Sequence, residues 1–303
     1  MSFRGTIGGE ELTFYLRELR HYLRSSAERT TQPMQNWKLT LAYDGTSFHG
    51  WQVQPGLPTI QGEVQAALQR ILGSHGDAPL PQGSGRTDTG VHALGQVASF
   101  MLAAPIPAEN LLRALNRTLP AAIRVLEAVP VPDRFHARHS AVAKTYEYRI
   151  FRGDPCSPFL APYVHACRWP LEMGLLAQAA SDVVGEHDFT SLAASDPELQ
   201  QRELQRREDG GESAGPSTVR TIFSSGWQEL PDELLVYRVR GNGFLHHMVR
   251  NLVGTMLEIG RSQFPAGSMP AILSARARSA AGPTAPAKGL FLHSVEYPPD
   301  SLL

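Results

Sequence analysis

Apolar and polar residues alternate in several short segments of the first half of the chain. The segment WKLTLAYDG places Leu39, Leu41 and Tyr43 on one face and ends in an Asp-Gly turn, a pattern typical of a β-strand. QVASFML and IRVLEAV are two further short segments in which apolar residues predominate. We therefore predict three strands between residues 37 and 129.

Two longer segments between these strands repeat their apolar residues at helical spacing. QGEVQAALQRILG carries an apolar stripe that closes at Gly73, and AENLLRALNRTLP ends at Pro120. Glycine just after a periodic segment and a terminating proline are typical ends of helices. The order β-α-β-α-β predicts an α+β fold rather than a helix bundle.

The second half of the chain contains a similar set of elements without a visible sequence repeat. TYEYRIF alternates, TIFSSGWQ and LLVYRVRG read as an antiparallel pair, and GLFLHSVEYP reads as a closing strand. LEMGLLAQAASDVVG and FLHHMVRNLVGTMLEIG have helical periodicity. We predict two α/β halves around a mainly antiparallel sheet.

The predicted domain organisation has a core flanked by less regular segments. One amphipathic helix is expected near the N-terminus, where Leu12, Leu16, Leu19 and Leu23 recur at helical spacing. A charged, Gly/Ser-rich stretch in the second half reads as a solvated insertion. The predicted parts are an N-terminal extension (1–36), an N-terminal half (37–142), a C-terminal half (143–298) with the insertion at about 196–217, and a tail (299–303).

Composition and charge exclude several classes of protein. With 28 basic and 29 acidic residues the net charge is -1, so any nucleic-acid surface must be local. Two cysteines form no disulfide framework or metal-ligand spacing, which favours a reducing, cytoplasmic location. The sequence lacks the roughly 20 consecutive apolar residues that a membrane helix needs, and no membrane partner is expected.

Two short motifs resemble a cofactor-binding motif and a metal site, but neither has the residues or the spacing that such a site needs. GSGRTD begins like a dinucleotide-binding GxGxxG motif, but Asp88 stands where the third glycine should be. His246 and His247 are adjacent on a predicted helix, where neighbouring side chains point about 100° apart rather than toward one ion. We expect no metal and no nucleotide cofactor.

The stretch GSGRTDTGVHALGQVASF holds an acid in an unusual setting. Asp88 lies two residues from Arg86, among glycines that permit tight backbone turns. A nearby guanidinium favours the ionised form of a carboxyl group. An ionised, aimed carboxylate can act as a nucleophile or a base, although an acid in a loop is more often an ordinary solvated residue.

The segment GRTDTGVHALGQV resembles the catalytic motif of the TruA family of tRNA pseudouridine synthases. Other segments resemble this family in the same order, and together they span about residues 37 to 298. Thr89 stands where many members have alanine, and residues 1–36 and part of 196–217 have no clear counterpart. The similar segments are YDGTSFHGWQVQP, TIQGEVQAAL, FHARHSAVAKTYEYRI, GEHDFTSL, GNGFLHHMVRNLVGTM and AKGLFLHSVEYP.

The resemblance implies a pseudouridine synthase fold with a central RNA-binding cleft. It implies isomerisation of uridine in the tRNA anticodon stem-loop, at about positions 38 to 40, on bases that must be unstacked to be reached. A homodimer and a reaction without cofactor are also implied. Carried over residue by residue, Asp88 is the nucleophile, Arg86 assists nucleotide flipping, and Arg250 forms a salt bridge with Asp88.

Some assignments remain open on the sequence alone. Tyr146 and Tyr148 lie on the same face of one strand, and only the motif match selects Tyr146 as the active-site tyrosine. Leu290 or Leu292 is expected to line the uracil pocket, and Leu292 is our choice. Arg86 in a structural salt bridge and Arg250 at the surface are the ordinary alternatives for these two arginines.

RNA contacts are predicted in the basic segment that joins the two halves. RFHARHSAVAKTYEYRIFR contains Arg138 and Lys144 and only one acid, Glu147, so it can bind phosphates or simply be a solvated face. His92 is a further candidate for substrate contact, with a buried structural histidine as the alternative.

Three functions are compatible with these patterns. The first is a tRNA pseudouridine synthase, and the second is an RNA-binding module that has lost catalysis. Retention of Asp88, Arg86, Tyr146 and Arg250 disfavours the second. The third, a glycoside-cleaving enzyme, usually needs two carboxylates at a defined separation, and no second acid stands in a comparable motif. The order of steps, attack on C1′ or a glycal route, is left open.

Overall fold

The computed structural model describes residues 34–73, 77–103, 106–194 and 217–302. The predicted N-terminal helix and nearly all of the predicted insertion lie outside these residues. The chain separates into two compact units. Unit 1 comprises the described residues up to Ala141 and those from Val295 onward, and unit 2 runs from Val142 to Ser294.

Unit 1 contains an antiparallel sheet in which β1 (Gln35–Tyr43) lies between β3 (His92–Leu102) and β4 (Ile123–Val131). The short β2 (Gln82–Gly83) pairs with β3. The predicted alternation in the first strand is confirmed, because Leu39, Leu41 and Tyr43 are all buried. β3 begins four residues earlier than predicted and therefore includes the end of the GRTDTGVHALG motif.

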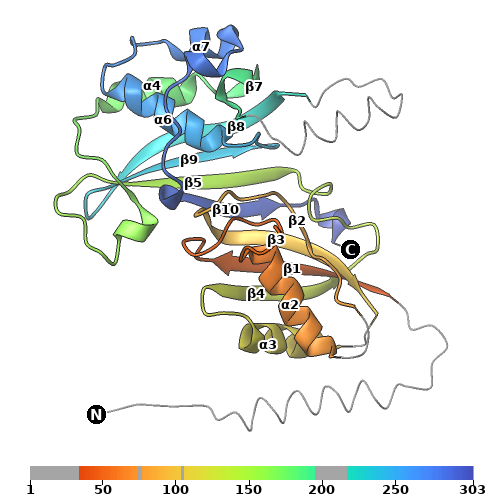
Figure 1. The fold of residues 1–303 in the computed structure, drawn as a ribbon. Coiled ribbons are helices and arrows are strands. Elements are labelled where there is room, and N and C mark those ends of the chain that lie inside the picture. Colours follow the sequence, from red (N-terminus) through yellow and green to blue (C-terminus); the bar gives the residue numbers. More distant parts are fainter. Residues whose placement is uncertain (1–33, 74–76, 104–105, 195–216, 303) are drawn as a thin grey trace, which may run out of the picture. The chain divides into compact units, whose positions relative to one another are not determined.

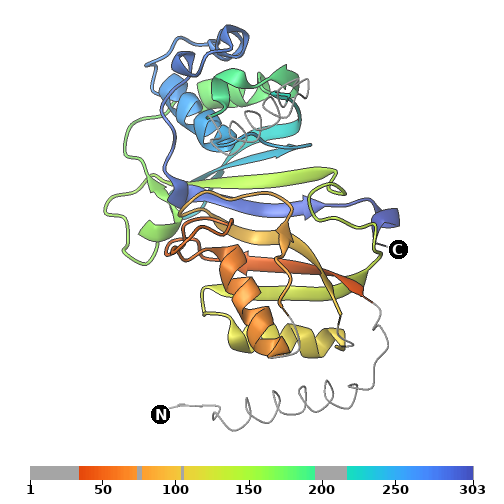
Figure 2. The same ribbon diagram turned by 45° about the vertical axis from the view of Figure 1, so that its right-hand side comes forward.

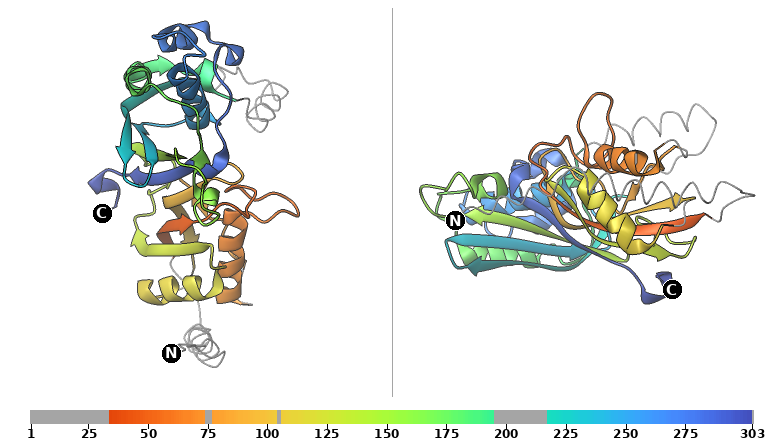
Figure 3. Two further views of the ribbon diagram at one scale, coloured as in Figure 1. Left: turned by 90° about the vertical axis from the view of Figure 1, so that its left-hand side faces the viewer. Right: turned by 90° about the horizontal axis from the view of Figure 1, so that it is seen from below.

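Among the described residues of unit 1, the helices α2 (Ile60–Leu72) and α3 (Ala108–Thr118) cover one face of this sheet (Figures 1 and 3). The Thr59 hydroxyl accepts a hydrogen bond from the Gly62 N–H at the start of α2, as expected of an N-cap. Gly73 has a φ of 62° at the end of the helix. The predicted apolar stripe of α2 is confirmed by its buried residues, which include Val64, Leu68 and Ile71.

Residues from Val295 onward pack into unit 1. The Tyr297 ring lies 5.0 Å from that of Phe135, and its hydroxyl donates to the Ala137 carbonyl at 2.6 Å. Leu302 is packed against the same apolar cluster. The C-terminal segment thereby holds the chain that follows β4, where Arg138 was predicted to meet RNA.

The strands of unit 2 follow one another in the order β10-β5-β9-β8-β7. The strands β8 and β9 form the predicted antiparallel pair, and β9 also pairs with β5. The two-residue β6 adds to β5 in parallel. The strand bounds are β5 (Ala143–Phe151), β6 (His165–Ala166), β7 (Gly185–Asp188), β8 (Val219–Leu230), β9 (Leu234–Gly241) and β10 (Leu290–Glu296).

The described residues of unit 2 include three α-helices: α4 (Met173–Ser181), α6 (Met248–Gly260) and α7 (Met269–Ala275). Figure 2 shows α4 and α6 beside the β8 and β9 strands. The predicted stripe of α6 is confirmed from Met248 to Leu257, with every apolar residue between them buried. None of the helices in the described ranges is both long and apolar enough to cross a membrane.

The start of α6 differs from the prediction. The helix begins at Met248 rather than at Phe244, because His247 has a left-handed backbone with a φ of 57°, which a right-handed helix cannot contain. His246 and His247 therefore lie before the helix, with ring centroids 4.0 Å apart. The expectation that they point 100° apart on a helix was wrong.

The two faces of the unit 2 sheet differ in polarity. Tyr148 of β5 lies opposite Tyr237 of β9 on one face, and both are fully buried. On the other face the buried Glu147 accepts hydrogen bonds from the Nε atoms of Arg149 at 2.7 Å and Arg238 at 2.8 Å. Burial would raise the pKa of Glu147, but the two arginines outweigh it and hold this pKa below its usual value.

Glu147→Gln should therefore lower the stability of unit 2 at neutral pH, by about 1–3 kcal/mol for a buried, charge-assisted contact. Because the folded-state pKa is depressed, the contribution of Glu147 is present above the unfolded-state pKa of about 4.3. It is lost as the pH falls through the lower folded-state pKa. The measurement is denaturant unfolding at several pH values, followed by tryptophan fluorescence.

A matched control is available at an exposed ion pair. Glu127 bonds to Lys38 at 2.9 Å with 49% of its side chain exposed. Glu127→Gln should cost no more than about 0.5 kcal/mol, as surface pairs do. An equal loss in both variants, or a loss in Glu147→Gln that does not shrink in acid, would contradict the assignment.

Candidate active site

Asp88 lies in the loop from Ser84 to Val91, between β2 and β3. Its side chain is half-buried, whereas Arg86 is exposed. The Asp88 carbonyl accepts a hydrogen bond from the Val91 N–H at 3.1 Å, and Gly90 within this turn has a φ of 77°. A tight turn with a left-handed residue favours glycine, which explains the glycine two residues after the acid.

The residue before Asp88 is held on two sides. The Thr87 carbonyl accepts from the Trp51 N–H at 3.0 Å, and its hydroxyl lies 2.8 Å from the Tyr43 hydroxyl. Tyr43 is 4% exposed, and burial raises the pKa of its phenol. Thr87 and its neighbours are therefore anchored to β1 and to the segment that precedes α2.

Gln96 anchors the other end of the loop, and the sequence did not single it out. Its Nε2 donates to the Gly85 carbonyl at 2.9 Å, and its Oε1 accepts from the Ser84 hydroxyl at 2.7 Å. Gln96 is fully buried, and buried amides must find hydrogen-bond partners. A polar residue inside the buried strand that follows the motif was the available indication.

His92 was predicted to contact substrate, but its side chain is 1% exposed. The Gly45 N–H donates to His92 Nδ1 at 3.1 Å. Asp44 Oδ1 lies 3.2 Å from the same nitrogen, but a nitrogen that accepts from Gly45 has no proton to give the carboxylate. The structure therefore assigns His92 to holding the loop against the turn after β1.

Arg138 is exposed in the segment that follows β4. The Nδ1 atom of His136 accepts hydrogen bonds from the backbone N–H groups of Arg138 at 3.0 Å and His139 at 3.3 Å. Burial lowers the pKa of His136, with a smaller contribution from His139. The neutral imidazole thus shapes the backbone from which Arg138 projects.

The two tyrosines of β5 have different surroundings in unit 2. Tyr148 is fully buried, and its hydroxyl donates to the Pro286 carbonyl at 2.9 Å. Burial raises the pKa of Tyr148, so it remains a donor to the backbone. Tyr146 is 8% exposed and meets the Phe244 ring edge-on at 5.0 Å between centroids. This difference favours Tyr146 for contact with a substrate.

Arg250 lies in the first turn of α6 and is bound to the segment Pro283–Pro286, which we call the strap. Its Nε donates to the Ala285 carbonyl at 2.8 Å. The Ala285 N–H donates back to the Arg250 carbonyl at 3.1 Å. The two opposed bonds fix the strap to the helix and orient the Arg250 side chain, as expected for a guanidinium near a core.

Asn251 supports the strap and was also missed from the sequence. Its Oδ1 accepts from the Thr284 hydroxyl at 2.7 Å and from Arg278 at 3.1 Å. Gly254, one turn further along α6, leaves room for the strap, because a Cβ there would overlap the Pro283 carbonyl. The available indication in the sequence was an asparagine within the apolar stripe MVRNLVG, and the structure shows that Asn251 is fully buried.

The predicted site residues thus fall in both units. Lys144 is half-buried at the start of β5, and Leu290 and Leu292 are both buried on β10, so burial does not choose between the two leucines. Unit 1 holds Arg86, Asp88, His92 and Arg138, and unit 2 holds Lys144, Tyr146, Arg250 and Leu292.

A sequence model described as tRNA pseudouridine synthase matches residues 40–140 and 179–298 of the chain. The match includes the Asp88 loop in unit 1 and Arg250 with its strap in unit 2. The chain belongs to the tRNA pseudouridine synthase family. Members of this family are isomerases, and the predicted α+β fold class and family are confirmed.

Individual relatives agree with the family match over most of the chain. A tRNA pseudouridine synthase A of Solibacter usitatus (strain Ellin6076) is 53% identical over 265 residues, which cover 87% of this chain and 100% of the relative. One of Moorella thermoacetica is 44% identical, covering 86% of this chain and 98% of the relative. One of Bordetella petrii is 43% identical, covering 88% and 93%.

Proposed function

We propose that this member of the family converts uridine to pseudouridine in the anticodon stem-loop of tRNA, at about positions 38 to 40, where the target base must leave its stack. The observation that carries the proposal is the Asp88 loop. A half-buried carboxylate sits in a turn anchored by Thr87 and Gln96, within a family that acts on tRNA. Such anchoring suits a group that must be aimed at one atom.

The proposed reaction breaks the C1′–N1 bond, turns the uracil and forms a C1′–C5 bond. The proton leaves C5 and N1 gains one, so no atom is added or lost overall. Asp88 is the proposed reacting carboxylate, either by attack on C1′ or by removal of the 2′ proton. Tyr146 is proposed to stack on the extruded uracil and to serve in proton transfer, with Leu292 lining the pocket.

The remaining assignments concern the RNA and the assembly. Arg86, proposed to assist flipping, and Arg138 are both exposed, which suits contact with phosphates. Lys144 extends the same basic segment. Recognition of shape and backbone would suit a target set at adjacent positions. We also propose that the protein is a homodimer, that it is cytoplasmic and that it acts without a cofactor.

The test uses unmodified tRNA transcript with uridines throughout the anticodon arm. Pseudouridine is mapped with a base-specific chemical probe after incubation with the full-length protein. We expect conversion confined to the anticodon arm and a binding constant that falls steeply with salt. Binding without conversion would favour a binding module, and conversion elsewhere in the tRNA would refute the proposed position.

Arg250→Lys should slow turnover about tenfold or more, because lysine keeps the charge but not the planar, multiply bonded geometry of arginine. The Ala285 carbonyl would lose its Nε donor. The measurement is single-turnover conversion of the transcript, with tRNA affinity determined in parallel. Arg113→Lys is the control, since Arg113 is 52% exposed in a surface ion pair. Equal rates in the two variants would refute a role for Arg250.

A further inference from the structure

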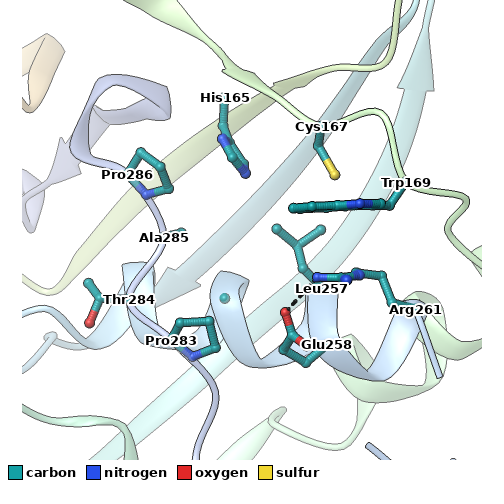
Figure 4. Close-up of a pocket in the computed structure, with 11 residues that line it drawn as sticks. His165, Cys167, Trp169, Leu257, Glu258, Arg261, Pro283, Thr284, Ala285 and Pro286 are labelled. Carbon is teal, nitrogen blue, oxygen red and sulfur yellow. Dashed lines mark hydrogen bonds and ion pairs between the residues drawn. The ribbon is translucent and has the colours of Figure 1, made fainter. Parts of the chain in front are cut away.

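A cavity of about 180 Å³ lies in unit 2, beside the strap. Three segments line it: the chain at residues 165–169, the C-terminal half of α6, and the strap itself. Figure 4 shows His165, Trp169 and Pro286 around it. Trp169 is 54% exposed and both strap prolines are exposed, so the cavity reaches the surface.

The charged groups in the cavity wall are already compensated. Arg261 stacks on the Trp169 ring, 3.9 Å from its centroid, and pairs with Glu258 at 3.1 Å. Burial lowers the pKa of His165, with help from the charge of Lys288, so the imidazole is neutral near pH 7. Burial raises the pKa of the Cys167 thiol. The wall therefore favours an uncharged ligand.

The size of the cavity and the chemistry of its lining further limit the class of ligand that it can bind. Leu257, Pro283, Ala285 and Pro286 supply apolar surface. The neutral His165 offers one hydrogen-bond donor and one acceptor. A cavity of about 150 Å³ is enough to hold benzene, so this one admits a planar ring of benzene to indole size with one hydrogen-bonding group.

Occupancy would act on the strap, and the strap holds Arg250. The Ala285 and Pro286 carbonyls accept from Arg250 Nε and from the Tyr148 hydroxyl. The strap cannot move toward α6, because it already lies against Gly254 where even a methyl group would overlap the Pro283 carbonyl. A ring that shifts the strap must shift it outward and lengthen the bond to Arg250.

We propose that this cavity is a binding site for a small, uncharged, planar heterocycle, and that its occupancy slows the enzyme by loosening the attachment of Arg250 to the strap. The proposed binding of the ligand depends only on residues of unit 2. The proposed effect on the enzyme rests on the proposed function, because it requires Arg250 to matter for turnover.

Binding is tested with indole titrated into RNA-free, full-length protein by calorimetry. Cys167→Ala should keep the affinity within about threefold, whereas Cys167→Leu, which extends a 2% exposed side chain into the cavity, should weaken it at least about tenfold. Crystals of the unmodified protein soaked in indole provide a readout that needs no variant. Absence of saturable binding, or equal affinity in Cys167→Leu, would overturn the site.

Coupling is tested by turnover of tRNA transcript at saturating indole. We expect kcat to fall at least about threefold with KM unchanged, since the strap orients a side chain rather than binding RNA. Cys167→Leu should raise the indole concentration that gives half of this fall at least about tenfold. Indole binding with unchanged kcat would overturn the coupling. If the unmodified protein makes no pseudouridine, the proposed function fails, while calorimetry still decides the site.

Discussion

Asp88→Asn is expected to abolish pseudouridine formation, by roughly 10⁴-fold or more, as loss of a reacting group does in other enzymes. The amide matches the carboxylate in size, so the loop should keep its anchors to Tyr43 and Gln96. A neutral amide can neither attack C1′ nor remove the 2′ proton. The measurement is single-turnover conversion of tRNA transcript, with filter binding to confirm that affinity for tRNA persists.

Asp133→Asn is the matched control, because Asp133 is an exposed acid in the same unit. It should convert tRNA at the unmodified rate. Conversion by Asp88→Asn at a comparable rate would remove Asp88 as the essential group. Loss of tRNA binding together with activity would indicate damage to the loop instead, and unfolding curves would distinguish that outcome.

Gly50→Ala is expected to disturb the Asp88 loop from outside the motif. Gly50 has a φ of +84°, and a Cβ there would lie 2.6 Å from the Thr87 carbonyl oxygen and 3.2 Å from the Asp88 carbonyl carbon. The loop must move away, and a misplacement of about 1 Å can cost about 10²-fold in rate. We expect kcat to fall by about 10- to 100-fold, measured in single-turnover conversion.

Gly56→Ala separates crowding from backbone strain. Gly56 has a similar φ of +72°, but nothing lies within 4 Å of the added Cβ. Both variants should lose about 1 kcal/mol of stability from the left-handed backbone, but only Gly50→Ala should lose activity. Equal kcat values in the two variants would show that the loop tolerates displacement.

The strands and helices were predicted well where the pattern of burial is local. The alternation in β1 and β5 and the stripes of α2 and α6 follow from which residues must face a core. The prediction failed at the start of α6. The apolar stripe continues into Phe244 and Leu245, and nothing in the residue types reveals that His247 adopts a left-handed backbone.

The short elements escaped prediction for a related reason. β2 and β6 have two residues each, too few to form a period, and they exist because β3 and β5 offer them hydrogen-bonding edges. α7 is only seven residues long. Isolated helices of this length are not stable in water, so its packing in unit 2 maintains it.

The sequence by itself determined the family, because residue types and spacing within GRTDTGVHALG are local properties, and it made Asp88 the predicted reacting group. It also predicted the longer helices and strands of the two halves. The motif match had selected Tyr146 over Tyr148, and the tertiary structure added a physical difference between them, because the Tyr148 hydroxyl donates to the Pro286 carbonyl. Tertiary structure also revealed the anchors at Gln96 and Asn251 and the strap on Arg250. These depend on hydrogen bonds between residues that lie 11 to 35 positions apart, and a local pattern of residue types does not specify such partners.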